Sequence, residues 1–234
     1  MNKPVVQFGS VSVGDVPRLV GIVSSLDQAD SLFSGDRPPC DLIELRLDRI
    51  GVDTDDWLEC GKAVEAQGFP VIATLRIGEE GGNWTGPDTA RRSVFLNALE
   101  HLSAIDIELR SALLSELAEH VERRERGLIV SHHDFKKTPQ EADLEEVIRR
   151  ASVNNHTVVK IAAHIEREND IARLKSLFSR ERSLPLCIIG MGEAGTPTRV
   201  EFPKLGSCLA YGHLGESTAP GQLPLTELAA RIRR

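Results

Sequence analysis

The chain has 234 residues, of which 41% are hydrophobic and 27% charged, a composition typical of a globular protein with a sizeable core. A formal net charge of −7 argues against a broad nucleic-acid-binding surface, and no apolar run approaches the roughly 18 residues of a membrane-spanning helix. The N-terminus lacks the apolar stretch of a secretory signal, so we expect a cytoplasmic protein with neither a nucleic-acid nor a membrane partner. The cysteines are widely spaced without a C-x-x-C pair, so no metal site is expected.

Short apolar runs recur at regular intervals along the chain and predict eight β-strands after an N-terminal segment of partly alternating residues. The predicted strands cover residues 19–24, 41–46, 70–76, 105–110, 127–132, 157–162, 185–190 and 206–211. Helical patterns lie between them, as over residues 88–102 and 140–151. Strands that alternate with helices predict parallel βαβ units, and eight such units close into a (β/α)8 TIM barrel. We expect the segment over residues 5–13 to form a β-hairpin that covers one end of the barrel.

A doubly wound open sheet is the competing fold for this pattern. Such a sheet usually carries a glycine-rich phosphate-binding turn after its first strand. Here that turn is S-S-L-D-Q-A (24–29), which contains no glycine. The sequence therefore favours the barrel, and because no linker interrupts the series we expect a single domain over residues 1–234.

Polar and apolar side chains alternate along several of the predicted strands. Residues two apart on a strand share a face, and one face carries charged or polar groups while the other carries Leu, Ile or Val. The polar face comprises Glu44, Arg46, Asp48, Thr74, Arg76, Asp106, Glu108, Arg110, Ser131, His133 and Lys160. In a barrel this face points inward, and most of these residues lie toward the C-terminal ends of strands, where barrel active sites form. Buried charges are costly unless paired, so this face is either an ion-pair network or a site.

Lys160 lies within T-V-V-K-I-A-A (157–163), a run typical of a buried strand. Loss of hydration favours the neutral amine and can move a lysine pKa from about 10.4 towards 7–8. A neutral amine in a dry pocket attacks carbonyls and forms a Schiff base. The alternative is a lysine in a structural ion pair. The segment alone does not decide between them, but polar neighbours on the same face favour a functional Lys160.

Other candidate residues follow the predicted strands. His132 and His133 are adjacent, and strand alternation favours His133 as the inward residue, where a histidine could shuttle protons for a reactive amine. Glu80, in a glycine-bearing loop, either orients His133 or is a surface acid. Arg199, after a glycine-rich stretch, either clamps a substrate carboxylate or is a surface arginine. The loop over residues 218–222 either closes over the site or caps the last helix.

Seven segments in chain order resemble the type I 3-dehydroquinate dehydratases (3-dehydroquinases), Schiff-base-forming (β/α)8 barrels of the shikimate pathway. They are E-L-R-L-D (44–48), T-L-R-I-G-E-E-G-G (74–82), D-I-E-L-R (106–110), S-H-H-D-F-K-K-T-P (131–139), K-I-A (160–162), M-G-E-A-G-T-P-T-R (191–199) and T-A-P-G-Q (218–222). The resemblance implies elimination of water from 3-dehydroquinate to give 3-dehydroshikimate. It implies no cofactor, because lysine itself supplies the electron sink, and it suggests a homodimer.

The resemblance also implies roles for individual residues. Lys160 would form the imine with the substrate ketone, His133 would be the general acid and base, and Glu80 would hold His133. Residues that would contact the substrate or order the site are Glu44, Arg46, Arg76, Arg199, Thr218, Gln222 and Ser24, with Ser25 as an alternative to Ser24. Met191 and Tyr211 would form apolar walls, and Ala219 would lie in the closing loop.

Departures from the family pattern are conservative. Thr218 stands where serine is commoner, Tyr211 where phenylalanine is commoner, and Thr198 where serine often precedes the arginine. We expect them to tune affinity and to leave the activity in place. Two other functions share these features: a Schiff-base aldolase, which usually acts on phosphorylated sugars, and an inactive module that only binds the metabolite.

Overall fold

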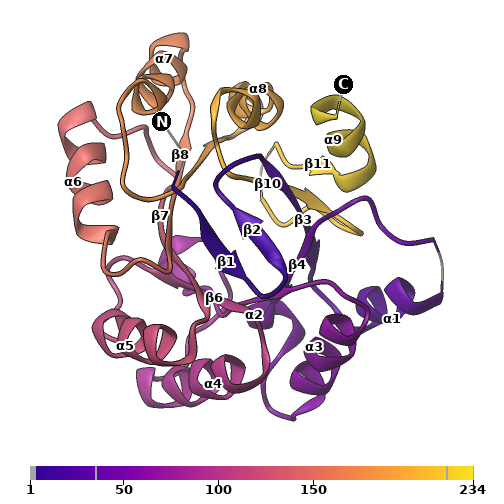
Figure 1. Ribbon diagram of the computed structural model, residues 1–234. Coiled ribbons are helices and arrows are strands. Elements are labelled where there is room, and N and C mark those ends of the chain that lie inside the picture. Colours follow the sequence, from indigo (N-terminus) through magenta and orange to yellow (C-terminus); the bar gives the residue numbers. More distant parts are fainter. Residues whose placement is uncertain (1–3, 35, 220, 234) are drawn as a thin grey trace.

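A ring of parallel β-strands surrounded by helices forms the body of the protein (Figure 1). The structure is a computed structural model that describes residues 4–34, 36–219 and 221–233. Within these residues the ring consists of β3 (Arg18–Val23), β4 (Leu42–Arg46), β5 (Val71–Thr74), β6 (Ala104–Glu108), β7 (Gly127–Asp134), β8 (Thr157–His164), β9 (Leu186–Met191) and β10 (Leu209–His213). Each strand from β3 to β9 pairs in parallel with the next, and β10 pairs in parallel with β3.

The ring closes between β9 and β10. There the amide of Cys208 donates a hydrogen bond of 2.8 Å to the carbonyl oxygen of Leu186. A short strand, β11 (Leu223–Pro224), lies parallel to β10. The structure confirms the predicted (β/α)8 barrel and excludes the open sheet.

Helices that follow the strands form the outer layer of the barrel. They are α1 (Leu26–Ser34), α2 (Leu47–Ile50), α3 (Asp56–Ala66), α4 (Asp88–His101), α5 (Leu114–Arg124), α6 (Glu141–Ala151), α7 (Glu168–Ser176), α8 (Thr198–Leu205) and α9 (Leu225–Ile232), with the short 3-10 helices η1 (Gly78–Glu80), η2 (Leu177–Ser179) and η3 (Glu193–Gly195). Helices α4 and α6 coincide with the helical patterns of the sequence. Among the described residues, no helix is both long and apolar enough to cross a membrane.

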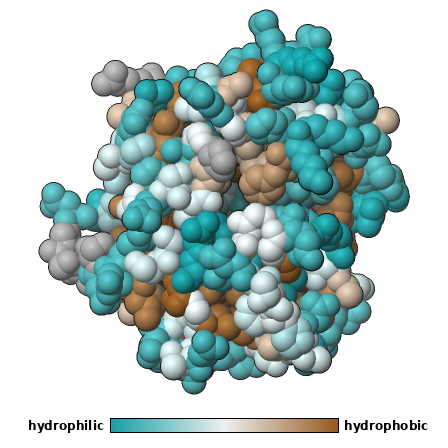
Figure 2. Space-filling model, turned by 180° about the vertical axis from the view of Figure 1, so that it is seen from behind, coloured by the Kyte–Doolittle hydropathy of each residue, from teal (hydrophilic) through white to brown (hydrophobic). Residues whose placement is uncertain are grey.

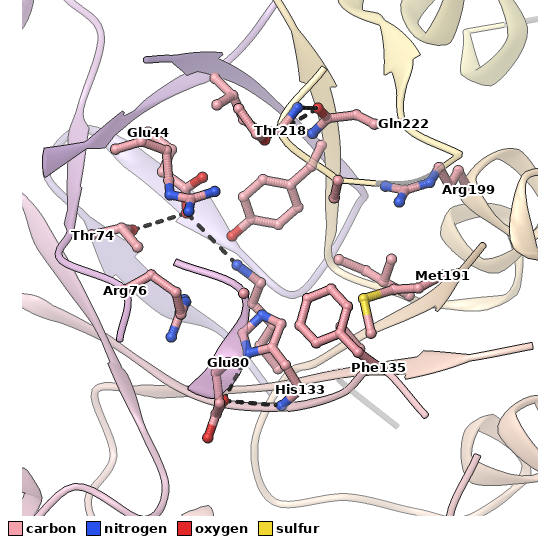
Figure 3. Close-up of a pocket in the computed structure, with 18 residues that line it drawn as sticks. Glu44, Thr74, Arg76, Glu80, His133, Phe135, Met191, Arg199, Thr218 and Gln222 are labelled. Carbon is pink, nitrogen blue, oxygen red and sulfur yellow. Dashed lines mark hydrogen bonds and ion pairs between the residues drawn. The ribbon is translucent and has the colours of Figure 1, made fainter. Parts of the chain in front are cut away.

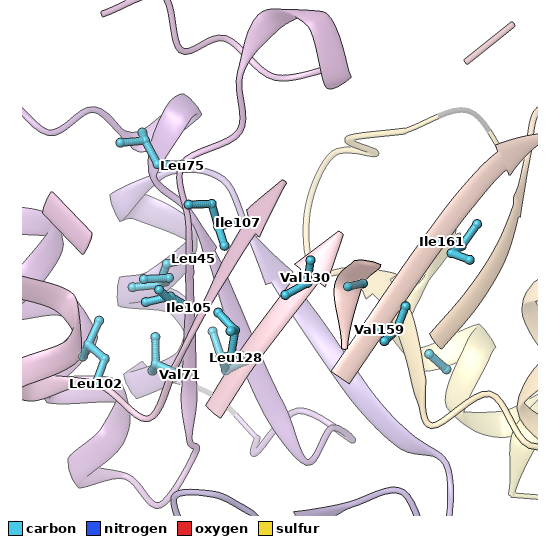
Figure 4. Packing of buried hydrophobic residues seen from close by; sticks show 14 of the residues in the cluster. Leu45, Val71, Leu75, Leu102, Ile105, Ile107, Leu128, Val130, Val159 and Ile161 are labelled. Carbon is cyan, nitrogen blue, oxygen red and sulfur yellow. The ribbon is translucent and has the colours of Figure 1, made fainter. Parts of the chain in front are cut away.

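The larger hydrophobic core lies between the strands and the outer helices. It contains the outward-facing residues of the strands, such as Ile105 and Ile107 of β6 and Val159 and Ile161 of β8, all of which are buried. Figure 4 shows these side chains with others of the same cluster. Burial of this layer holds the helices against the ring and leaves the alternate, inward-facing positions free for other side chains.

The inward-facing positions change character along the barrel. Towards the N-terminal ends of the strands they are apolar and form a second, smaller core, which includes Leu42, Ile72, Ala104, Ile129 and Val158. Two residues further along the same strands stand Glu44, Thr74, Asp106, Ser131 and Lys160, all buried. The predicted polar face therefore does point inward, and it occupies the C-terminal half of the barrel.

The predicted hairpin covers the N-terminal end of the barrel. Strands β1 (Val6–Phe8) and β2 (Val11–Val13) pair antiparallel, with Val6 opposite Val13. Phe8 is fully buried against Gly127, where an added Cβ would come within 2.1 Å of the Phe8 ring. Figure 2 shows the molecule from the side opposite to Figure 1, where hydrophilic side chains cover most of the surface. The hairpin closes the N-terminal end of the barrel, and the inward-facing polar side chains lie towards the C-terminal end.

Candidate active site

A pocket of about 540 Å³ of empty space, open to solvent, lies at the C-terminal ends of the strands (Figure 3). The lining residues are Ile22, Glu44, Arg46, Thr74, Arg76, Glu80, Gly81, His133, Phe135, Lys160, Ala162, Ile189, Met191, Arg199, Tyr211, Thr218, Ala219 and Gln222. Of the residues that the sequence proposed as catalytic or substrate-binding, Ser24 alone is absent from this lining.

Lys160 lies in β8 with its ammonium group at the inner end of the pocket. Its Nζ is 3.0 Å from Oδ2 of Asp106 and 3.7 Å from Oε1 of Glu44, and it lies 4.2 Å from the centre of the Tyr211 ring. The residue is 5% exposed. The ion pair that the sequence offered as an alternative to a reactive lysine is thus present. It lies within the pocket itself, so pairing and function are compatible.

Asp106, in β6, connects Lys160 to the rest of the polar cluster. Its carboxylate accepts hydrogen bonds from Arg76 Nη2 at 2.6 Å, Ser131 Oγ at 2.7 Å and Lys160 Nζ at 3.0 Å. Burial alone would raise the pKa of Asp106, but the cations of Arg76 and Lys160 outweigh it and hold that pKa well below its usual range. Asp106 therefore provides a fixed negative charge beside the amine.

Arg76 lines the pocket and is held by hydrogen bonds from several side chains. Its Nη1 donates to Glu108 Oε1 at 3.0 Å and to Ser131 Oγ at 2.7 Å. Burial opposes the charge of Arg76, yet Asp106 and Glu108 raise the pKa of its guanidinium above the ordinary value. Most of the N–H donors of Arg76 are engaged by protein groups, so its role is to fix the side chains of the site in place.

Arg91 supports this cluster from outside the barrel. It belongs to α4, is 1% exposed, and donates to Glu108 and, over 3.1 and 2.9 Å, to the carbonyl oxygen of Leu75. Leu75 immediately precedes Arg76, so Arg91 fixes both the backbone and the carboxylate partner of Arg76. The sequence did not identify Arg91, because its helical pattern does not distinguish it from its half-buried neighbour Arg92.

His133 and Glu80 form a hydrogen-bonded pair at the pocket wall (Figure 3). Nδ1 of His133 lies 2.9 Å from Glu80 Oε2, which also accepts the His133 backbone amide at 3.1 Å. Arg110, exposed and beyond the end of β6, pairs with the other oxygen of Glu80 at 3.2 Å. The inward direction expected for Arg110 is therefore wrong, since the strand ends before it. His132 is absent from the lining, as strand alternation indicated.

The electrostatics of this pair favour a neutral imidazole. Burial lowers the pKa of His133 well below its ordinary value, and the cations of Arg76 and Lys160 lower it further. Burial raises the pKa of Glu80 to about 7, against the opposing effect of Arg76. When Glu80 is ionised it accepts a hydrogen bond from the Nδ1–H of His133, which leaves the lone pair on Nε2. The arrangement thus provides a base whose tautomer is fixed.

Asp48 joins three of the segments that surround the pocket. It lies in α2 with a fully buried carboxylate, which accepts two hydrogen bonds of 2.9 Å from the Arg46 guanidinium. The same carboxylate accepts the amides of Arg76 at 3.5 Å and Asn83 at 3.1 Å. Asn83 belongs to the loop that carries Glu80. One buried carboxylate therefore fixes the ends of β4 and β5 and the loop that orients His133.

Arg199 and Gln222 lie together on the opposite side of the pocket from Arg76 (Figure 3). Arg199 is 7% exposed, and burial lowers its pKa to about 10, so it remains protonated at neutral pH. The amide and hydroxyl of Thr218 donate to Gln222 Oε1 over 2.9 and 3.2 Å. Pro220, in the same loop, lies outside the described residues. This side of the pocket offers a cation and an amide, the groups that bind a carboxylate.

Ser24 directly follows β3, and its polar groups are directed to helix α1. Its amide and hydroxyl donate to Gln28 Oε1 over 2.9 and 3.2 Å, and the Ser25 hydroxyl accepts the Gln28 amide at 3.3 Å. Neither serine lines the pocket, so a contact of Ser24 with substrate stays a prediction. Phe135, in contrast, lines the pocket and stacks on His133 with ring centres 6.4 Å apart; the segment S-H-H-D-F contained it, but its role was not identified.

The described residues contain no group of three His, Cys, Asp or Glu side chains placed to hold a metal ion.

Comparison with known proteins gives consistent matches over nearly the whole chain. Residues 13–232 match the family model of the type I 3-dehydroquinase. A 3-dehydroquinate dehydratase from Methanocella arvoryzae is 32% identical over 218 residues, which are 93% of this chain and 96% of that protein. The crystal structure of the 3-dehydroquinate dehydratase from Aquifex aeolicus is 27% identical with a TM-score of 0.79, and the match covers 92% of this chain and 97% of that one. The enzyme from Geobacillus kaustophilus, 23% identical, has the same fold with a TM-score of 0.87 over 100% of this chain and 97% of its own.

Proposed function

Because the chain belongs to the type I 3-dehydroquinase family, we propose that Lys160, His133 and Glu80 carry out the reaction of that family in the pocket described above. Its activity is that of a hydro-lyase of the shikimate pathway, which removes water from 3-dehydroquinate to give 3-dehydroshikimate. The observation that carries the residue assignment is the pairing, in one pocket, of a buried amine with a histidine held in one tautomer by a carboxylate.

The first step is attack on the substrate ketone by the neutral amine of Lys160. A C–N bond forms, the carbonyl electron pair moves to oxygen, and the resulting carbinolamine loses water to give a protonated imine. Asp106 and Glu44, at 3.0 and 3.7 Å from Nζ, lie where the positive charge of the imine nitrogen develops. Charges that are already in place need no reorganisation, so they stabilise this intermediate effectively.

The second step is elimination, which requires His133. Its neutral Nε2 removes a proton from the carbon next to the imine; the C–H electron pair forms a C=C bond to the imine carbon, and the C=N electron pair moves to nitrogen. The resulting enamine expels the hydroxyl group, which leaves as water with the proton returned by His133. Hydrolysis of the product imine then frees Lys160. Glu80 holds the Nδ1 proton of His133 throughout, so the same nitrogen serves as base and then as acid.

Substrate binding divides between the two sides of the pocket. We assign the substrate carboxylate to Arg199 and Gln222, with Thr218 ordering the Gln222 amide. The hydroxyl groups would contact Glu44 and Arg46, which line the side nearer to Lys160. Arg76, engaged by Asp106, Glu108 and Ser131, supports these contacts through the fixed cluster.

Trapping of the imine tests this assignment. Borohydride added during turnover should reduce the intermediate to a stable amine, and mass spectrometry of peptides should place the added mass on Lys160. His133→Ala should still form this adduct while elimination, followed by the absorbance of the conjugated product, slows severely. Absence of an adduct on Lys160 in an active preparation would contradict the imine mechanism. An adduct without turnover in the wild type would favour an inactive binding module.

We also propose, from the sequence alone, a single domain that acts as a cytoplasmic homodimer. The chain has a mass of 25.7 kDa. Sedimentation of the full chain at that mass, with no dimer at micromolar concentration, would contradict the proposed oligomeric state.

A further inference from the structure

The hydroxyl of Tyr211 is a polar group of the pocket to which the mechanism above gives no role. It lies in β10, lines the pocket, and is 5% exposed. The centre of its ring is 4.2 Å from Nζ of Lys160, so the ring packs against the reactive amine. It is also the only tyrosine of the sequence, which makes it accessible to selective chemical replacement.

The hydroxyl of Tyr211 is buried and has no hydrogen-bond partner among the described residues. Burying a hydroxyl without a partner costs free energy, and a phenylalanine would supply the same ring without that cost. A side chain that served only as an apolar wall of the pocket would therefore not need this hydroxyl oxygen. A hydroxyl of this kind inside a binding pocket is expected to meet its partner on the ligand.

The surroundings of this hydroxyl indicate which role it can take. Burial raises the pKa of Tyr211 well above its ordinary value, and the charges of Glu44 and Asp106 raise it further. The phenol therefore stays protonated at neutral pH and can donate a hydrogen bond. The same two carboxylates contact Lys160 Nζ, and the Tyr211 ring lies 4.2 Å from that atom, so the phenol is next to the reactive amine.

We propose that the Tyr211 hydroxyl donates a hydrogen bond to the ketone oxygen of the substrate while Lys160 attacks the carbonyl carbon. This inference rests on the proposed function and adds a catalytic residue to it. The carbon that becomes bonded to Nζ must lie beside the Tyr211 ring, because Nζ itself packs on that ring. The oxygen on this carbon is then a substrate acceptor close to the Tyr211 side chain.

The chemistry of this contact is electrostatic. As the Nζ lone pair forms the C–N bond, the carbonyl electron pair moves to oxygen, and the phenol O–H stabilises the growing negative charge. The oxygen receives the proton released by the attacking amine, and it departs as water with a second proton taken from solvent when the imine forms. Tyr211 keeps its own proton throughout. Its effect should therefore be confined to imine formation and to the reverse step, product hydrolysis.

Tyr211→Phe tests the proposal because it removes only the oxygen. Rapid mixing with saturating 3-dehydroquinate, followed by borohydride quenching and mass spectrometry, measures imine formation on Lys160. We expect this rate to fall about tenfold or more, as for loss of other donors to a developing oxyanion. Thermal stability should be unchanged or higher, because an unpaired hydroxyl is removed. An imine-formation rate within about twofold of the wild type would overturn the proposal and leave Tyr211 as a wall.

The same protein with 3-fluorotyrosine at position 211 distinguishes loss of the hydrogen-bond donor from a change in side-chain shape. Because the chain has one tyrosine, growth on 3-fluorotyrosine alters this position alone and makes the phenol more acidic, hence a stronger donor. Imine formation should then be at least as fast as in the wild type. Equal slowing by 3-fluorotyrosine and by Tyr211→Phe would contradict a donor role. The wild-type adduct is the control: if it does not form, the imine mechanism fails, whereas if it forms at equal rates in all proteins only the Tyr211 inference fails.

Discussion

The two ends of the barrel interior are built from the same strands but serve different purposes. At the N-terminal end, Leu42, Ala104 and Val158 pack beneath the hairpin as hydrophobic core. Two residues further along the same strands, Glu44, Asp106 and Lys160 form a charged cluster open to the pocket. A step of two residues, about 7 Å along a strand, thus separates side chains that stabilise from side chains that react.

This difference explains how a barrel can tolerate buried charge. The cost of burying Lys160, Asp106 and Arg76 is offset in part by their mutual contacts, and the remaining stability comes from the apolar layer and the hairpin at the other end. Substitutions at the two ends should therefore separate stability from activity. The following five substitutions test that separation; Val158→Ala is the control for Lys160→Met, and the others run from the largest expected loss of activity to the smallest.

Lys160→Met and Val158→Ala change neighbouring inward positions of β8. Lys160→Met should reduce turnover by about 10⁴-fold or more, because it removes the nucleophile. Val158→Ala should leave kcat within about twofold but lower the free energy of unfolding by about 1–3 kcal/mol, because it removes apolar contacts. Product absorbance and denaturant unfolding measure the two effects. A similar loss of turnover in both variants would contradict the separation.

Glu80→Gln should lower kcat by about 10- to 100-fold, since His133 then loses the carboxylate that fixes its tautomer. Glu80 has a pKa raised to about 7 in the folded protein, so kcat/KM of the wild type should increase as pH rises through about 7. This increase should disappear in Glu80→Gln. A pH profile with the same step in both proteins would assign it to another group.

Glu80 also links stability to pH. Its pKa rises on folding from 4.5 to about 7, so folding favours the neutral carboxyl. The stability that this provides is fully present below pH 4.5 and is lost as pH rises through about 7. Relative to Glu80→Gln, whose side chain stays neutral, the wild type should therefore lose stability over this interval, which thermal unfolding across the pH range would measure.

Asp48→Asn should have a smaller effect on activity, about tenfold in kcat, because Asp48 acts through Arg46 and the Glu80 loop rather than on substrate. The amide that replaces one oxygen faces a donor, so we also expect a loss of about 1–3 kcal/mol in stability. A structural role alone would lower the melting temperature without altering the pH dependence of kcat/KM. A changed pH dependence would show that the orientation of Glu80 depends on Asp48.

Phe8→Ala, in the hairpin, should have the smallest effect on activity and a large one on stability. The ring is fully buried against the start of β7, so its loss should cost about 3–5 kcal/mol. At a temperature where the variant remains folded, kcat should stay within about twofold of the wild type. Loss of activity before unfolding, seen by comparing turnover with circular dichroism, would connect the hairpin to the site.

Strand alternation in the sequence was sufficient to predict most of this arrangement. The rule that places Val158 and Lys160 on one face of β8 holds in the structure because hydrogen bonding to both neighbouring strands fixes the alternation. The rule fails where backbone pairing ends. Strand β5 ends at Thr74, not at residue 76, because the Arg76 carbonyl accepts the amide of Trp84 in the following loop.

Contacts between distant loops could not be predicted from a strand pattern. Asp48 was assigned to the inward face, but it lies in α2, where its carboxylate meets amides from elsewhere in the chain. Arg91 and Arg92 are adjacent in α4, yet only Arg91 turns inward to Glu108. Both positions depend on which segments the fold brings together, and local sequence does not record that.

Closure of the ring has a consequence for the order in which the protein folds. The first strand of the ring, β3, pairs with the last strand of the ring, β10, so these partners are separated by most of the chain. During synthesis on the ribosome, one edge of β3 remains unpaired until β10 has emerged. The apolar residues of the hairpin remain incompletely buried until then. Contacts of such large sequence separation slow folding and prolong exposure of strand edges. Chaperone dependence and aggregation of nascent chains should therefore be greatest for chains truncated just before β10.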